Sequence, residues 1–484
     1  MFGLPAHADS EAPNVLFILV DDLGRQDVSP YNPDTFYDTP NVQRLADTGM
    51  TFTDAYVSNP VCSPSRISFM TGQYPSRYDA TNFFCGDRSA KYRGAKYNCR
   101  MPTHLTTLGE AFQEAGYGTY FAGKWHLGPD EKHWPKQRGF DVNKGGFSAG
   151  APYYGGDTGY WPPYKNPRLE DGPKGEYLPY RLAEETRTYI ENHKDEPFLA
   201  YLSFYEVHNP KTAPDELIQK YKKRRKQRGL DEKKEFGTTE QVWPGHGDTR
   251  KVRIRQGHPV YAAMVEATDR AIGRVLQKLE EEGLRDETIV VFTSDHGGLS
   301  TSEGHNTSNR PLRGGKGWMY EGGLRVPMIV SWPGEVEPGS VSKQPIMNTD
   351  FFPTLLHATG QSARPDDHID GTSFLPVLKG ASRDEFSRGE PMYWHYPHYA
   401  NQGGPPAGAI RMGPWKLVER YEDGSVELYN VRNDISESNN VADQKPKLVR
   451  RMRKNLHKWY REVDAKFLRQ KGNSPTPWRP DYLE

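Results

Sequence analysis

The chain has 484 residues, and its 63 Lys and Arg residues balance its 63 Asp and Glu residues, so its formal net charge is zero. A neutral chain has no global field that draws it to nucleic acid or to an anionic membrane, so an anionic substrate must be attracted by a local patch. No segment is long and apolar enough to span a bilayer, and 12% aromatic residues indicate a folded chain rather than a disordered one.

The N-terminal segment, residues 1–13, is predicted to be a leader or the remnant of a signal peptide. Ala6, His7 and Ala8, directly before Asp9, resemble the cleavage site of an export signal, although a basic start and a full apolar run are missing. On this pattern we expect an exported protein, periplasmic or extracellular, with a plain N-terminal extension as the alternative.

From residue 14 the chain alternates between strand patterns and helix patterns. Residues 14–20, NVLFILV, form a continuous apolar run, as in a strand buried on both faces of a parallel sheet. Similar strand patterns follow at residues 119–122, 197–204, 288–293 and 326–332. Helix patterns alternate with them, at residues 105–117, 180–193, 262–282 and 350–359. This order predicts an α/β fold with a large mixed, mostly parallel sheet sandwiched by helices.

The last hundred residues have a different pattern. Short strand segments at residues 409–418 and 426–431 surround turn signals, and a charged helix pattern follows at residues 446–467. We therefore expect a leader at residues 1–13, a catalytic domain at residues 14–385, and a smaller C-terminal α+β subdomain, a small antiparallel sheet with a helix, at residues 386–484.

Ionisable residues follow four of the predicted strands within a few positions. In open α/β sheets, ligands bind beyond the carboxyl ends of the strands, so these residues are expected to meet in one active site. They are Asp21, Asp22, Lys124, His126, Glu206, His208, Asp295 and His296.

Asp21 and Asp22 are two adjacent carboxylates at the end of a buried strand. Like charges this close repel unless a cation compensates them, and a hard divalent ion with oxygen ligands does so. A helix cap or a turn is the alternative for either pair, but with Asp295 and His296 at a second strand end the pattern favours a metal site.

Cys62 lies beside a cation, in the segment Cys62-Ser63-Pro64-Ser65-Arg66. A cysteine next to Arg66 at a helix start is either a thiolate of low pKa or a structural residue. The two other cysteines, Cys85 and Cys99, lie close together in a polar stretch, and either pair in an exported protein or stay as thiols.

The motifs of this chain, taken together, resemble those of type I sulfatases of the alkaline phosphatase superfamily. The set comprises Cys-x-Pro-x-Arg at residues 62–66, followed by Thr-Gly, and four further motifs in the order of that family: Asp-Asp at 21–22, Gly-Lys-Trp-His-Leu-Gly at 123–128, Ser-Asp-His-Gly at 294–297 and Gly-Gly-Lys-Gly at 314–317. The resemblance covers about residues 14 to 440, and it implies an alkaline-phosphatase-like fold.

The resemblance also implies the cofactors. A formylglycine-generating or sulfatase-maturating enzyme oxidises the cysteine of this family to formylglycine, whose hydrate is the nucleophile, so Cys62 is the expected site. The expected metal is Ca²⁺, with Mg²⁺ as the alternative. Its ligands carry over to Asp21, Asp22, Asp295, His296 and the modified Cys62, although many members have Asn where this chain has His296.

Five further residues take catalytic roles from the same resemblance. Arg66 orients the formylglycine diol, while Lys124 and Lys316 bind the sulfate oxygens. Lys316 and His208 lie by the leaving group. His126 deprotonates the second diol hydroxyl, which expels sulfate from the covalent sulfo-enzyme and regenerates the aldehyde.

The expected substrate is a sulfated poly- or oligosaccharide. His104, His305 and Arg313 are the candidates for its binding rim, and the aromatic stretches at residues 147–164 and 393–399 are either sugar subsites or ordinary packing. The basic run at residues 220–234 is a solvated face or an attractor of a polyanion. The overall pattern is similar to that of bacterial polysaccharide sulfatases.

Three other functions are compatible with parts of this pattern. A phosphodiesterase or phosphonate monoester hydrolase of the same superfamily can share the formylglycine motif, but the two-zinc members use Thr or Ser as nucleophile and need more ligands. An arylsulfatase would act on small aryl sulfates. A catalytically inactive glycan-binding relative is disfavoured, because no expected catalytic position is replaced.

Overall fold

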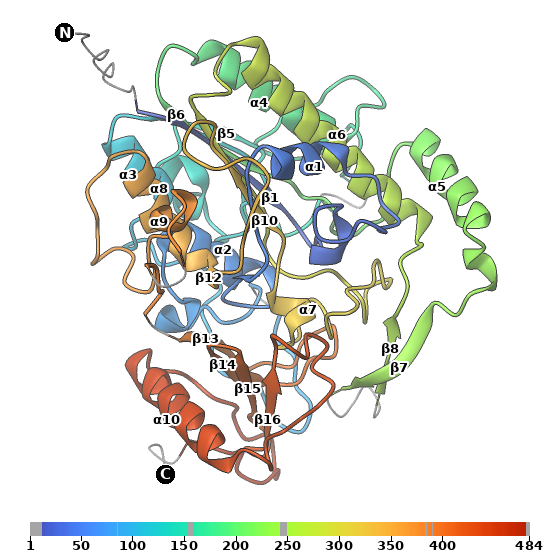
Figure 1. The fold of residues 1–484 in the computed structure, drawn as a ribbon, viewed down its shortest axis with the longest axis vertical. Coiled ribbons are helices and arrows are strands. Elements are labelled where there is room, and N and C mark those ends of the chain that lie inside the picture. Colours follow the sequence, from blue (N-terminus) through green and yellow to red (C-terminus); the bar gives the residue numbers. More distant parts are fainter. Residues whose placement is uncertain are drawn as a thin grey trace.

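The computed structural model describes residues 12–84, 86–152, 159–242, 249–382, 385–389 and 391–480. Figure 1 shows a central sheet covered by helices, with a separate unit formed by the C-terminal part of the chain, drawn in red. No helix among the described residues is long and apolar enough to cross a membrane. The predicted leader lies mostly in residues 1–11, outside these ranges.

The central sheet has eight strands in the order β11-β2-β10-β9-β1-β6-β4-β5. Strands β9, β1, β6, β4 and β5 pair in parallel, while β10 runs antiparallel to β9 and β2. The prediction of a large mixed, mostly parallel sheet is therefore confirmed. Its strands are β1 (Asn14–Val20), β2 (Met50–Phe52), β4 (Gly118–Gly123), β5 (Val142–Lys144), β6 (Phe198–Ser203), β9 (Thr288–Ser294), β10 (Met328–Ser331) and β11 (Ser340–Ser342).

Strand β1 is buried on both faces because its side chains alternate between two hydrophobic cores. One face contributes Leu16, Ile18 and Val20 to a core with helices α1 (Pro40–Asp47), α4 (Leu178–Asn192), α5 (Asp215–Gln227) and α6 (Pro259–Glu281). The other face contributes Val15, Phe17 and Leu19 to a core with helices α2 (Cys62–Thr71), α3 (Leu108–Glu114), α8 (Phe351–Ala358) and α9 (Leu375–Leu378). The sheet is thus sandwiched by helices, as predicted.

Two helices differ from their predicted bounds because of capping residues. Helix α3 begins three residues later than expected, since Thr107 Oγ1 accepts from Glu110 N (3.1 Å) and Glu110 Oε2 accepts from Thr107 N (2.8 Å), a capping box. Helix α6 begins three residues earlier, because Pro259 is favoured at the first helical position and His258 caps the helix by accepting from Tyr261 N.

The C-terminal unit is a four-stranded antiparallel sheet in the order β13-β14-β15-β16 with one long helix, which confirms the predicted α+β subdomain. Its elements are β13 (Met392–Tyr396), β14 (Ala407–Met412), β15 (Trp415–Arg420), β16 (Val426–Asn430) and α10 (Pro446–Glu462). Tyr393 stacks on Trp459 of α10 at 4.9 Å between ring centroids. The aromatic stretch 393–399 therefore packs the core of this unit and is not a sugar subsite. The domain boundary at residue 385 stays a prediction.

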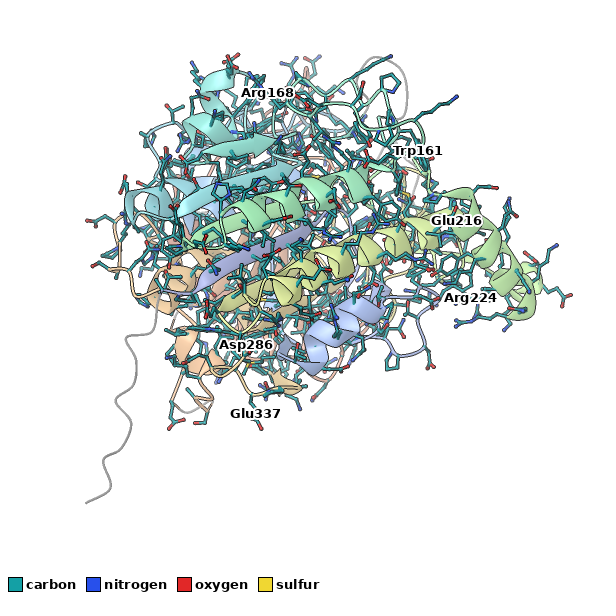
Figure 2. The ribbon with its side chains drawn as sticks, turned by 90° about the horizontal axis from the view of Figure 1, so that it is seen from above. Trp161, Arg168, Glu216, Arg224, Asp286 and Glu337 are labelled. Atoms are coloured by element: carbon teal, nitrogen blue, oxygen red, sulfur yellow. The ribbon has the colours of Figure 1, made fainter. Side chains whose placement is uncertain are left out.

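The remaining elements are short or peripheral: β3 (Ala55–Tyr56), β7 (Phe236–Gln241), β8 (Thr249–Arg253), α7 (Glu321–Leu324), β12 (Ile346–Met347) and the 3-10 turns η1 (Arg25–Asp27), η2 (Pro75–Tyr78), η3 (Glu131–His133), η4 (Pro135–Gln137), η6 (Leu230–Glu232) and η7 (Asn348–Asp350). Figure 2 shows Glu216 and Arg224 of α5 at the margin of the molecule. Arg224 pairs with Asp38 at 2.6 Å, so part of the predicted basic run is neutralised within the fold.

We predict that the buried ring of His395 makes the protein less stable in acid. Its Nε2 donates to Lys466 O (2.9 Å), and burial lowers the pKa of this imidazole to about 3. Below the ordinary His pKa of about 6.5 the unfolded chain gains a proton that the folded chain does not, which removes about 2 kcal/mol of stability by pH 5. Urea unfolding at pH 7 and pH 5 measures the loss.

The variant His395→Gln should lose less stability than the wild type between these two pH values. His104→Gln is the matched control, because His104 is exposed and its substitution should leave the pH dependence unchanged. An identical loss in His395→Gln and wild type would contradict the assignment.

Candidate active site

The candidate active site lies at the carboxyl ends of β1, β4, β6 and β9, where the N-terminus of α2 meets the sheet. Each strand end is followed by ionisable side chains. Asp21 and Asp22 follow β1, Lys124 and His126 follow β4, His208 follows β6, and Asp295 and His296 follow β9. Since the four strands are adjacent and parallel, their carboxyl ends share one edge of the sheet.

Four of the predicted metal ligands form one compact group. Asp21, Cys62, Asp295 and His296 each offer a ligand atom, and these atoms all lie within 4.8 Å of one another in a fully buried setting. The fifth, Asp22, adjoins them with its Oδ1 at 3.3 Å from His296 Nε2. Its Oδ2 is buried and has no hydrogen-bond partner among the described residues. Three carboxylates with an orphaned buried oxygen fit a hard divalent cation.

Three cations pair with the three carboxylates. Lys124 Nζ contacts Asp21, Lys316 Nζ lies 2.7 Å from Asp22 Oδ1, and Arg66 Nε lies 2.9 Å from Asp295 Oδ2. Burial raises the pKa of the Asp22 carboxyl, but Lys316 and the nearby histidines outweigh it and lower that pKa to about 2. Burial and the neighbouring Asp295 raise the pKa of Asp21 instead. The neighbouring cations thus stabilise the charged form of Asp22 more than that of Asp21.

Cys62 is the first residue of α2, preceded by the extended Val61. Its Sγ lies 3.2 Å from His296 Nε2 and 3.7 Å from Asp21 Oδ1. Burial raises the pKa of the thiol, but Lys124, Lys316 and His296 outweigh burial and hold this pKa well below its usual value. Position 62 is therefore built to carry negative charge, at a helix N-terminus that favours it.

The Thr-Gly that follows the cysteine motif ends α2. Gly72 has φ 65°, and a Cβ added there would lie 2.6 Å from His368 Cβ, so a side chain is excluded by both backbone and packing. Gly315 has a similar role beside Lys316, because an added Cβ would lie 2.3 Å from Gly298 O. The glycines of two motifs therefore position Cys62 and Lys316 rather than contact a substrate.

Arg66 is held in place from two directions. Its Nη1 donates to Lys124 O (2.8 Å) and to Ser203 Oγ (2.8 Å), while its Nε donates to Asp295. The side chain is 3% exposed. The guanidinium consequently links the ends of β4, β6 and β9.

Two histidines face the same cavity. Burial lowers the pKa of His126 to about 4, and burial together with the nearby Lys316 lowers that of His208 to about 4. His208 Nδ1 lies 2.8 Å from Asn209 O, and because a carbonyl only accepts, Nδ1 carries the proton. Both rings are thus neutral near pH 7 and able to accept a proton.

Four of the six residues of predicted catalytic role line a cavity of about 740 Å³, whereas Arg66 and Lys124 are buried and do not line it. These four residues are Cys62, His126, His208 and Lys316, and the part of the wall that they form is called the reactive end below. Gly150 and Ala151 also line the cavity, and they belong to the stretch 147–164, which the sequence predicts to be either a sugar subsite or ordinary packing. The rest of the wall comes from loops that the sequence did not single out for function: Phe83, Phe84, Arg88, Asn209, Pro210, Lys211, Glu303, Asn401 and Gln402. Isolated polar residues in loops carry no periodic or motif signal, so sequence reasoning missed them.

None of the three predicted rim residues lines this cavity. His104 is exposed and packs against Tyr78, with ring centroids 6.0 Å apart. His305 Nε2 donates to Lys251 O (3.1 Å) and its ring packs on Phe236.

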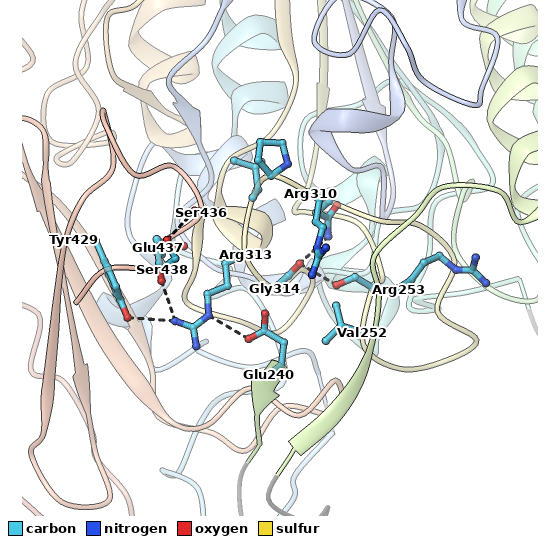
Figure 3. A pocket seen from close by; sticks show the side chains of 14 residues that line it. Glu240, Val252, Arg253, Arg310, Arg313, Gly314, Tyr429, Ser436, Glu437 and Ser438 are labelled. Atoms are coloured by element: carbon cyan, nitrogen blue, oxygen red, sulfur yellow. Dashed lines mark hydrogen bonds and ion pairs between the residues drawn. The ribbon is translucent and has the colours of Figure 1, made fainter. Parts of the chain in front are cut away.

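Arg313 lines a different pocket, of about 470 Å³, where it pairs with Glu240 at 3.3 Å and donates to Tyr429 OH at 3.2 Å. Figure 3 shows these contacts. None of the three residues therefore lies in the wall of the cavity at Cys62, and their role at the substrate rim stays a prediction.

A buried ionic cluster of Lys416, Glu321 and Glu437 lies next to the site. Lys416 Nζ lies 3.0 Å from Glu321 Oε1 and 3.0 Å from Glu437 Oε1, and all three side chains are fully buried. Glu321 begins α7, and two residues later Gly323 O accepts from Gly297 N at 3.1 Å. The cluster therefore joins the C-terminal unit to the loop that carries Asp295 and His296.

Comparisons with known proteins show which sequences and structures this chain is similar to. A model of the sulfatase family matches residues 13–361, and a model of the C-terminal part of N-sulphoglucosamine sulphohydrolase matches residues 315–465. A sulfatase of Formosa agariphila is 29% identical and covers 93% of this chain and 89% of that protein. N-acetylgalactosamine-6-sulfatase of Canis lupus familiaris is 30% identical, covering 78% and 68%. The crystal structure of Ps i-CgsB has a TM-score of 0.74 and 29% identity, covering 93% of each chain.

We predict that Lys416→Met destabilises the protein by about 3–5 kcal/mol, because it leaves Glu437 as a buried carboxylate without a cation and leaves Glu321 with Arg325 alone. The matched control is Lys458→Met, which removes an exposed pair with Glu462 and should cost less than about 1 kcal/mol. Urea unfolding measures both. Equal costs for the two variants would show that the cluster has no special role.

Proposed function

Because the chain belongs to the sulfatase family and is a sulfuric ester hydrolase, we propose that it removes sulfate from a sulfated carbohydrate, with a formylglycine made from Cys62 and a bound divalent cation. One observation carries this proposal: a buried nucleophile position, a cation-ligand group and two lysines lie together, and Cys62 and Lys316 of this group line a wide cavity. A sulfate ester needs this combination of attack and charge stabilisation.

The metal ligands in this proposal are Asp21, Asp22, Asp295 and His296, together with position 62. Carboxylate oxygens favour Ca²⁺ or Mg²⁺. A bound ion of this kind stabilises negative charge on sulfate oxygens and on the nucleophile. We propose Ca²⁺, and the restoration of activity after chelation distinguishes it from Mg²⁺.

The nucleophile in this proposal is the hydrated aldehyde of formylglycine at position 62, made by a maturation enzyme. Arg66 is fixed by Asp295, Lys124 O and Ser203, so its guanidinium is pre-oriented beside that position. Lys124 and Lys316 bind the sulfate oxygens and offset their charge.

The two histidines transfer the protons in this proposal. His208 protonates the leaving alkoxide, and it takes up that proton when the anionic substrate binds beside it. His126 is a neutral imidazole against position 62 and accepts the proton of the second diol hydroxyl, which releases sulfate and restores the aldehyde.

A carbohydrate fits the cavity better than a small aryl group does. The space of about 740 Å³ far exceeds a sulfate group, and its wall beyond the reactive end presents the polar side chains of Asn209, Glu303, Asn401 and Gln402. Among the relatives, one is an N-acetylgalactosamine-6-sulfatase, and Ps i-CgsB has been crystallised with k-i-k-neocarrahexaose. Export to the periplasm or the extracellular space is proposed on the Ala6–Ala8 pattern alone.

Sulfate release from a panel of sulfated oligosaccharides and 4-nitrophenyl sulfate tests the proposed reaction. Protein co-expressed with a formylglycine-generating enzyme should release sulfate from a sugar, and Cys62→Ala should reduce kcat by at least about 1,000-fold, because the nucleophile is lost. Mass spectrometry verifies the conversion of position 62 beforehand.

Release from 4-nitrophenyl sulfate but from no sugar would redirect the assignment to an arylsulfatase. Turnover of phosphate or phosphonate esters alone would contradict sulfate as the leaving group.

Chelation tests the metal. Removal of bound ions by EDTA should lower kcat by at least about 100-fold, and Ca²⁺ should restore it. Asp295→Asn should resist this restoration, whereas Asp34→Asn, at an exposed position, should behave like wild type. Full activity in protein shown to be metal-free by elemental analysis would refute the metal site, and restoration by Mg²⁺ alone would change the ion.

A further inference from the structure

Two cations line the cavity wall beyond the reactive end. Lys211 and Arg88 come from different loops, and both line the cavity. Among the described residues neither has a carboxylate within 4.0 Å, whereas Lys124 and Lys316 each pair with an aspartate. Two cations without counter-charges in a substrate cavity are complementary to an anion that arrives with the substrate.

Lys211 is not an ordinary surface lysine. It is half-buried, and its Nζ donates to the neutral Asn306 Oδ1 at 3.2 Å. The ammonium packs over the bare backbone of Gly304, where an added Cβ would lie 1.8 Å from Nζ. An ammonium has three N–H donors, and one amide oxygen satisfies only one of them. The position of this charge is therefore fixed, and its remaining donors are available to a ligand.

The loop that carries Lys211 is tied to the reactive end. Asn209 Nδ2 donates to Glu303 O at 2.6 Å, and Asn209 O accepts from His208 Nδ1. Lys211 thus lies three residues from the proposed leaving-group acid, on the same loop. A group bound by Lys211 must belong to the leaving alcohol or to a neighbouring sugar, because Lys124 and Lys316 serve the scissile sulfate.

The opposite charge in the cavity is localised at one place. Glu303 Oε1 accepts from Asn401 and, at 2.8 Å, from Gln402 Nε2, both in the loop between β13 and β14. Among the described residues its Oε2 has no hydrogen-bond partner, so it can accept a sugar hydroxyl. A carboxylate there repels an anion, so a second anionic group is expected to contact Lys211 and Arg88 and not the Glu303 carboxylate.

We propose that the cavity recognises a second anionic group of the substrate, a sulfate or a carboxylate next to the scissile sulfate, through Lys211 and Arg88. The preferred substrate is thus a sugar with at least two negative charges, and Glu303 receives one of its hydroxyls. This inference rests on the proposed function, since it names the substrate class of the same site.

Matched pairs of substrates test it. Sugar monosulfates of glucosamine, galactose and N-acetylgalactosamine are compared with the same sugars carrying a second sulfate, and with disaccharides in which a uronate adjoins the sulfated unit. The readout is the ratio of kcat/KM for the dianionic and monoanionic member of each pair. In the pair that the wild type hydrolyses fastest, kcat/KM should be at least tenfold higher for the dianionic member. A larger ratio for the disulfated sugars would identify the second anionic group as a sulfate, and a larger ratio for the uronate disaccharides would identify it as a carboxylate.

The variants Lys211→Gln and Arg88→Gln should each lower that ratio by about tenfold, because each removes one charge-assisted contact. Lys222→Gln, at an exposed position of α5, is the matched control and should keep the wild-type ratio. Raising the ionic strength should lower the wild-type ratio and have less effect in Lys211→Gln.

The outcomes separate this inference from the function on which it rests. Sulfate release with a ratio near one, or equal ratios in wild type and both variants, overturns the second-anion subsite and leaves the sulfatase assignment intact. No sulfate release from any sugar by protein with verified formylglycine overturns both.

Discussion

The structure depends on the burial of three carboxylates at the ends of parallel strands and of a low-pKa thiol at the N-terminus of α2. Such a group is stable only if cations from other parts of the chain reach it. Lys124 reaches Asp21, Lys316 reaches Asp22, and Arg66 reaches Asp295. Each pair joins segments that are far apart in the sequence, so the charges that make the chemistry possible also fix the strand ends relative to α2 and to the glycine-rich loop at 314–317.

The two parts of the cavity have different origins. The reactive end is built on strand ends and on a helix N-terminus, where the backbone is rigid and the side chains are buried. The substrate wall is built on loops, including Asn401 and Gln402 from the C-terminal unit. The Lys416 cluster holds this unit against α7, behind the loop of Asp295 and His296. The C-terminal unit therefore contributes both to the support of the site and to the wall of its cavity.

Sequence interpretation was least specific for the residues of loops. His305 and Arg313 lie between motif residues in the chain, yet His305 packs on Phe236 and Arg313 lines a different pocket. The aromatic stretch at 393–399 is rich in rings that stack on sugars, but these rings fill the core between β13 and α10. Composition and neighbourhood in the chain predict which side chains are available, whereas the direction of a loop depends on the contacts it makes elsewhere.

The sequence by itself determined the alternation of strands and helices, the residues at the strand ends and the family of the protein, because apolar periodicity and short motifs are local properties of a chain. Only the tertiary structure decided which cation pairs with which carboxylate, that Gly72 and Gly315 act by close packing, and that Lys211, Arg88 and Glu303 line one cavity. These features depend on distances between segments up to hundreds of residues apart, and such distances are fixed by the packing of the whole fold and not by any local pattern.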